Sequence, residues 1–235
     1  LCVYSLISEG NTSKQISRSV IYLNHSENTL YYLGALAFYC PLTPSSGLKF
    51  ETTTEVSPWI SLNRWGSGSV RSLNWNDGQR LTRGWVSARS PAHFSIRKSG
   101  TRRERIDIST DVNGDPIALN GLGAEISELY FRKPDGTLMH LKNLPAGNSA
   151  TLSKVPSAPS AVGPVVSSNH IRQIYYSGAL RNMDQQIDHE QIQPGTYMAL
   201  LKEDPFLEKP LDGKVEINSE SLVIGILDPN EGTLQ

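Results

Sequence analysis

The chain has 235 residues, of which 19% are charged, and a formal net charge of −1. This length exceeds the usual domain size of roughly 100 to 200 residues, so one large β-sandwich or two smaller ones would fit. No run approaches the roughly 18 to 20 consecutive apolar residues that cross a bilayer, which excludes a transmembrane helix in this sequence. The chain starts at Leu1 with no basic and apolar leader, so we expect any export signal or anchor to lie outside it.

The first third of the chain predicts short β-strands. Apolar and β-branched runs occupy residues 1–7, 19–23, 30–39 and 48–56, and Ile21 and Leu23 alternate with polar neighbours. Further strands are predicted near residues 70–75, 81–88 and 92–97, with a tight turn at Asn76-Asp77-Gly78.

Two cysteines, Cys2 and Cys40, are the whole thiol content of the chain. If the protein is exported to an oxidising compartment, the two can form a disulfide; the alternative is a pair of buried thiols.

Residues 104–155 give the clearest pattern of strands and turns. Ile106 and Ile108 alternate with polar residues, and apolar runs then recur between turns about every ten residues. The predicted turns are at Asn113-Gly114, Asn120-Gly121, Pro134-Asp135-Gly136 and Pro145-Ala146-Gly147. This spacing is typical of a meander within an antiparallel β-sandwich.

The last third begins with a loop or linker at residues 156–168, which is rich in Pro, Ser and Ala. Partial helical spacing follows at residues 171–187, and two buried strands are predicted at residues 195–201 and 222–227. We therefore expect a mainly all-β, immunoglobulin-like antiparallel sandwich, single or double, with a short helical or irregular insert. The predicted domains are residues 1–99 and 100–235.

Charge is segregated along the chain despite the small net charge. Residues 64–105 hold ten basic and two acidic residues, and all four tryptophans lie in or beside this stretch. Guanidinium groups beside indoles can bind anionic ligands, because the charge attracts phosphate or carboxylate while the rings stack. The candidate ligand-binding residues are Arg64, Trp65, Arg71, Trp75 and Arg80. The alternative is that the tryptophans fill the core while the arginines are solvated or pair with the acidic C-terminal half.

Motifs for metal binding and nucleotide binding are incomplete. Asp111, Asn113 and Asp115 imitate the start of a calcium loop, but the glycine and the twelfth residue, Leu122, do not fit, so a polar hairpin turn is the better interpretation. Gly121-Leu122-Gly123 precedes a predicted strand, whereas phosphate binding needs a helix N-terminus. We predict no metal and no cofactor.

Catalytic motifs are equally sparse. The sequence has no Gly-x-Ser-x-Gly elbow, and its five histidines are scattered without zinc-ligand spacing. A glycan-active hydrolase needs only two carboxyl groups, and the crowded acids Asp188, Glu190, Glu203 and Asp204 keep that alternative open. We predict no catalytic residue, and expect a protein that is not an enzyme.

The pattern of residues 105–152, from Arg105-Ile106-Asp107-Ile108 through Asn120-Gly121-Leu122-Gly123 to Leu152, resembles the extracytoplasmic β-domains of bacterial inner-membrane proteins. Residues 194–206 and 223–227 are similar to the end of such a domain. Some members of that group work beside ABC-type exporters, so the resemblance implies a periplasmic or extracellular domain tethered to a membrane.

These expectations combine into one leading hypothesis, with two alternatives. The leading hypothesis is a non-catalytic module that contacts a protein partner in the cell envelope, in one version as an accessory to transport. The first alternative is a module that binds carbohydrate or another anion, such as an anionic glycan, through the basic, tryptophan-rich stretch. The second is the hydrolase. No nucleic-acid partner is expected.

Overall fold

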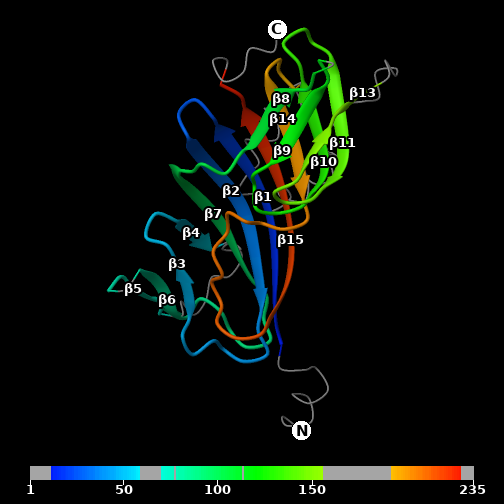
Figure 1. Cartoon of the computed structure of the whole chain (residues 1–235). Coiled ribbons are helices and arrows are strands. Elements are labelled where there is room, and N and C mark those ends of the chain that lie inside the picture. Colours follow the sequence, from blue (N-terminus) through cyan, green and yellow to red (C-terminus); the bar gives the residue numbers. More distant parts are fainter. Residues whose placement is uncertain (1–11, 59–69, 77, 113, 156–191, 229–235) are drawn as a thin grey trace.

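The computed structural model describes residues 12–58, 70–76, 78–112, 114–155 and 192–228. Every regular element in these ranges is a β-strand, which confirms the predicted all-β fold class. The strands form one large sheet and two small ones. In Figure 1 the long strands run the length of the molecule, with one small sheet toward each end.

The large sheet has nine strands in the order β13-β11-β10-β14-β15-β1-β2-β7-β4. Their bounds are β1 (Ser13–Asn24), β2 (Thr29–Tyr39), β4 (Glu55–Pro58), β7 (Ala92–Thr101), β10 (Ile126–Arg132), β11 (Leu138–Leu144), β13 (Ser153–Lys154), β14 (Thr196–Leu201) and β15 (Val215–Ile226). Neighbours are antiparallel except β1 and β15, which pair in parallel over their full length. The first and last described strands therefore lie side by side at the centre of the sheet.

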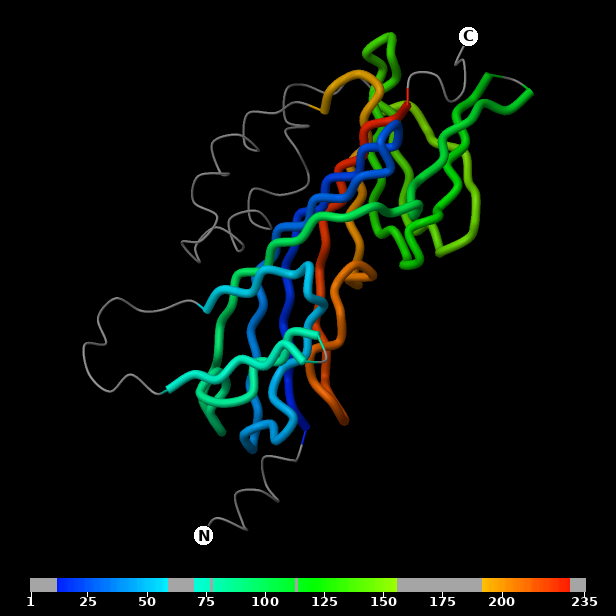
Figure 2. Tube along the Cα trace, turned by 90° about the vertical axis from the view of Figure 1, so that its left-hand side faces the viewer, coloured from blue at the N-terminus to red at the C-terminus, as the bar shows by residue number. Residues whose placement is uncertain are grey.

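Each small sheet has three strands. One is ordered β3-β6-β5, with β3 (Leu48–Phe50), β5 (Ser72–Asn74) and β6 (Gln79–Arg83). The other is ordered β12-β9-β8, with β8 (Ile106–Thr110), β9 (Pro116–Asn120) and β12 (Ser149–Thr151). Figure 2 shows the first sheet, in cyan, near one end of the long strands, and the green strands of the second near the other end.

Apolar side chains alternate along the long strands, and those on one face form a continuous core between the large sheet and the two small sheets. Leu30, Tyr32, Leu36 and Phe38 of β2 are all buried in this core. They occupy even positions, and successive residues of a strand point to opposite faces of the sheet. Burying an aliphatic or phenylalanine side chain of this size stabilises the fold by about 1.5–3 kcal/mol.

The structure differs from the sequence-based expectation in how strands combine. Residues 104–155 are divided between two sheets, because β12 pairs with β9 and not with β11. The strand order also differs from the seven-stranded immunoglobulin arrangement, in which both sheets are antiparallel. The expected domain boundary at residues 99 and 100 falls inside β7, and strands from both sides of it share the large sheet.

Candidate functional site

Residues 202–214 connect β14 to β15. In Figure 1 this orange segment passes between the two small sheets. Phe206 and Leu211 of this connection are buried in the core. The backbone N–H of Lys49 donates to the carbonyl of Pro210 over 2.9 Å, so the connection also lies along the β3 edge of its small sheet. Two carboxylates of the connection, those of Asp204 and Glu208, accept hydrogen bonds from side chains of other segments.

Asp204 accepts hydrogen bonds from two strands of the large sheet. Ser19 Oγ donates to its Oδ2 over 2.8 Å, and Tyr32 Oη donates to the same oxygen over 2.7 Å. Burial raises the pKa of the Asp204 carboxyl, and although the bonds from Tyr32 and Ser19 lower it, the net pKa is above the usual value. Burial also raises the pKa of Tyr32 well above its ordinary range, so the phenol stays protonated and donates. This arrangement ties the connection to β1 and β2.

Glu208 forms a second polar contact on the same connection. Lys98 Nζ lies 3.0 Å from its Oε1, and Thr54 Oγ1 donates to the same oxygen over 2.7 Å. Burial alone would raise the pKa of Glu208, but the bond from Thr54 and the charge of Lys98 outweigh it, so the net pKa is lowered. Glu208 is therefore ionised at neutral pH and cannot act as a proton donor there.

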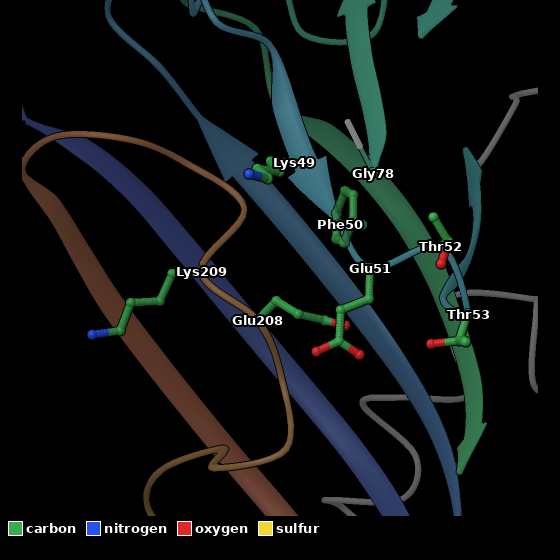
Figure 3. Close-up of a pocket in the computed structure, with 8 residues that line it drawn as sticks. All are labelled: Lys49, Phe50, Glu51, Thr52, Thr53, Gly78, Glu208 and Lys209. Carbon is green, nitrogen blue, oxygen red and sulfur yellow. The ribbon is translucent and has the colours of Figure 1, made fainter. Parts of the chain in front are cut away.

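Beside Glu208 lies an open pocket of about 550 Å³. Figure 3 shows two carboxylates near its centre, two lysines to one side and two threonines to the other. The lining residues are Lys49, Phe50, Glu51, Thr52, Thr53, Gly78, Glu208 and Lys209. The two acids and two bases in this lining balance in formal charge. The pocket therefore has no excess of either charge with which to select an ionic ligand.

A basic and aromatic surface lies along the open side of β5. Val70, Leu73 and Trp75 expose 77%, 41% and 54% of their surface. Arg71 precedes β5, while Arg80 and Arg83 belong to the neighbouring strand β6, opposite Asn74 and Ser72 of β5. No ion pair within the described part of the chain involves any of these three arginines. This β5 edge surface consists of Val70, Arg71, Leu73, Trp75, Arg80 and Arg83.

Trp85 makes two contacts at one end of the β5 edge surface. Trp85 Nε1 donates to the carbonyl of Ser72 over 2.8 Å, and the indole packs against the core. The guanidinium of Arg71 lies 5.2 Å from the centroid of the Trp85 ring, and its Nε donates to the Gly84 carbonyl over 3.4 Å. A cation over an indole is held in place without losing its charge, so Arg71 stays available to an anion.

The structure places three of the five residues predicted to bind a ligand on or next to β5 and β6. Arg71, Trp75 and Arg80 belong to the β5 edge surface, and Arg80 lies opposite Asn74 of β5 in the strand register. Arg64 and Trp65 lie outside the described residues, so their role stays a prediction. The predicted disulfide is untested as well, because Cys40 is buried but Cys2 lies outside the described residues.

The carboxylates considered for hydrolysis have other surroundings. Asp204 is enclosed by hydroxyl donors, Glu203 is exposed, and Asp188 and Glu190 lie outside the described residues. The polar turn expected from the calcium-like motif is present: Asp111 Oδ1 accepts from the backbone N–H of Asp115 over 2.8 Å.

Metal clusters and membrane helices are both missing from the described ranges. Within them, no group of three or more His, Cys, Asp and Glu side chains is placed to hold a metal ion. Nor does any helix in those ranges have the length and apolar character to cross a membrane.

Sequence reasoning missed several residues that matter to these surfaces. Arg83 and Leu73 were not singled out, although the same basic stretch contains both. The polar contacts of Lys98 and Ser19 were missed too. Their signal is a polar residue at an inward position of a strand. Lys98 follows the inward Phe94 and Ile96 in β7, and Ser19 precedes the inward Ile21 and Leu23 in β1.

Comparison with known proteins finds only distant structural similarity. No protein-family model matches the chain, and no curated protein matches it. Among solved structures, the yeast delta-COP-I mu-homology domain matches both in complex with the Dsl1 WxWxV peptide and alone. The TM-scores are 0.36 and 0.35 and the identities 11% and 9%, and each alignment covers 94% of this chain and 97% of that domain. A likeness this low does not indicate what the present chain binds.

Proposed function

We propose that this protein is a non-catalytic protein-binding module and that it binds its partner through the β5 edge surface. The observation that carries the proposal is the combination of three exposed apolar side chains with three arginines that make no described ion pair. Aromatic residues and arginine are enriched at protein interfaces, where they provide most of the binding energy.

The charge of this surface favours an acidic partner. Its six residues include three arginines and no acidic side chain, so the surface carries a positive charge. Such a surface attracts an acidic partner. Salt shortens the range of exposed charge interactions, so affinity should fall as ionic strength rises.

A peptide-selection experiment tests the proposed function. A displayed library of random peptides is selected on the wild-type chain, and the enriched peptides are then titrated against the triple variant Arg71→Ser, Arg80→Ser, Arg83→Ser. We expect the enriched peptides to be acidic. They should bind the wild type at least about tenfold more tightly than the triple variant, which corresponds to about 1.4 kcal/mol of binding free energy.

The matched control removes three positive charges elsewhere, with Arg103→Ser, Lys154→Ser and Lys202→Ser, all exposed in the structure. This control should keep wild-type affinity. The proposal fails if the enriched peptides show no acidic bias, or if they bind both triple variants equally. Heparin is titrated in parallel, and heparin binding with no peptide enrichment would favour the anionic-glycan alternative.

We also propose that the protein is located outside the cytoplasm, is tethered to a membrane and acts beside a transporter. These features are supported by the resemblance of residues 105–152 to extracytoplasmic β-domains. Fractionation of cells that express the complete gene product tests this location, and recovery in the cytosol alone would contradict it.

A further inference from the structure

We propose that β5 receives its partner by strand addition, so that an extended acidic peptide becomes the fourth strand of the β3-β6-β5 sheet. This inference rests on the proposed function and specifies how the β5 edge surface binds. Proteins commonly recognise extended peptides in this way, with backbone hydrogen bonds giving affinity and side chains giving selectivity.

The sheet has one open edge in the described part of the molecule. On the β3 side, the Lys49 N–H is already bonded to the Pro210 carbonyl. On the other side, no described strand pairs with β5. Figure 1 shows β5 projecting from the body of the molecule at this end, away from the large sheet.

The backbone of β5 has donors and acceptors directed to that open side. The Ser72 carbonyl faces β6, because Thr82 Oγ1 and Trp85 Nε1 both donate to it, over 3.2 and 2.8 Å. Successive residues of an antiparallel strand direct their N–H and C=O groups to opposite sides. The N–H and C=O of Leu73 therefore face away from β6 and are the groups to which a fourth strand would bond.

The side chains around this edge fit a peptide that alternates acidic and apolar residues. Leu73 and Trp75 are two positions apart and both exposed, so alternate apolar residues of an added strand can pack on them. Arg80 and Arg83 of β6 lie opposite Asn74 and Ser72 of β5. They are therefore on the face of the sheet away from Leu73, and the acidic positions of such a peptide would point to that face. Arginine binds carboxylate in bidentate geometry, which adds direction to the attraction.

Charge also argues against a second copy of this chain as the occupant. Two β5 edges placed together would bring six arginines into one small interface, with no carboxylate from either edge surface. Natural edge strands avoid pairing with themselves through short length and flanking charge, and β5 has both. An acidic partner is therefore favoured at this edge over a second copy of the chain.

N-methylated peptides test the mode of binding separately from the charge. The probe is a short blocked peptide of alternating glutamate and valine, made unmodified and in two N-methylated forms. One form is methylated on the glutamate amides and the other on the valine amides, so each blocks the donors of one edge of the strand. We expect one methylated form to bind the full chain at least about tenfold more weakly, and the other to bind like the unmodified peptide.

Amide exchange gives the second measurement. On binding of the unmodified peptide, exchange of the Leu73 amide should slow at least about tenfold, while the amide of Asp107 on the edge strand β8 should not change. Equal binding of both methylated forms, with no protection of the Leu73 amide, would overturn strand addition. The proposed function would still hold in that case if peptide binding depended on the arginines. If the unmodified peptide does not bind, or if the chain dimerises through β5 instead, strand addition of an acidic peptide is wrong.

Discussion

Asn120 shows how a single side chain decides the path of the backbone between two sheets. It is fully buried at the end of β9. Its Nδ2 donates to the carbonyls of Ala124 and Leu144 over 2.8 and 3.0 Å, and its Oδ1 accepts from the Leu122 N–H over 3.1 Å. Leu144 belongs to the large sheet and Asn120 to a small one, so the amide joins the two layers.

Replacement of Asn120 should therefore be costly. We expect Asn120→Ala to lower the free energy of unfolding by about 2–4 kcal/mol, because it removes the buried hydrogen bonds that the side chain makes with two carbonyls and one N–H. Asn120→Asp should be worse at neutral pH, since a carboxylate would face the same two carbonyls. Its defect should shrink in acid, where the protonated carboxyl can donate to one of them.

Chemical denaturation at several pH values measures these effects. The control is Asn148→Ala in the neighbouring turn, where the side chain is exposed and the change should stay within about 0.5 kcal/mol. Equal effects at positions 120 and 148 would show that the amide does not hold the layers together.

At the scale of elements, the connection of residues 202–214 is held by two carboxylates with opposite pKa shifts. The folded pKa of Glu208 lies below its usual 4.5, so its ionised form stabilises the fold above that pH. This contribution is lost as the pH falls through the folded pKa. The folded pKa of Asp204 lies above its usual 3.8, so its ionisation costs stability as the pH rises from 3.8 to the folded value.

The two isosteric variants should therefore respond to pH in opposite directions. Relative to wild type, Glu208→Gln should become less stable as the pH rises from acid to neutral. The loss at pH 7 should be about 2 kcal/mol, because the charged hydrogen bond from Lys98 is lost. Asp204→Asn should gain relative stability over the same rise. Thermal unfolding across the acid range measures both, with exposed Glu203→Gln as the control in the same segment. Parallel responses of the two variants would contradict the assigned pKa directions.

The same connection shows where prediction from sequence stops. The strands of residues 106–132 and 196–201 follow from alternation and turn chemistry, which are local properties and therefore legible in the sequence. The partners of Asp204 and Glu208 come from β1, β2 and β7, at least 110 positions away along the chain. Nothing local encodes such pairs.

The candidate site divides in the same way. Exposed Trp75 and its arginines were found from the composition of residues 64–105, because charge excess and aromatic content are visible in sequence. The composition could not show that β5 is an edge strand. Edge position depends on which strands pair, and a three-residue strand has too little pattern to predict that pairing.

At the scale of the whole molecule, the parallel pair of β1 and β15 closes the fold. β15 joins β14 and β10 at one end of the large sheet to β1, β2 and β7 at the other. One core cluster contains both Leu81 of β6, in the first small sheet, and Leu129 of β10, in the large sheet. A shared sheet and a shared core favour unfolding as one cooperative unit, whereas the sequence predicted two domains divided at residue 99.

Truncation of a core side chain at either end should thus weaken both ends. Leu81 and Leu129 are 1% and 0% exposed, so each change to alanine should cost about 2–5 kcal/mol. Hydrogen exchange followed by mass spectrometry then reports stability at β6 and at β10 separately. Because unfolding of either end breaks the sheet at β15 and β1, we expect each variant to speed exchange at both sites by a similar factor. If Leu129→Ala speeds exchange at β10 and leaves β6 protected, the two halves unfold independently and the predicted division of the chain is correct.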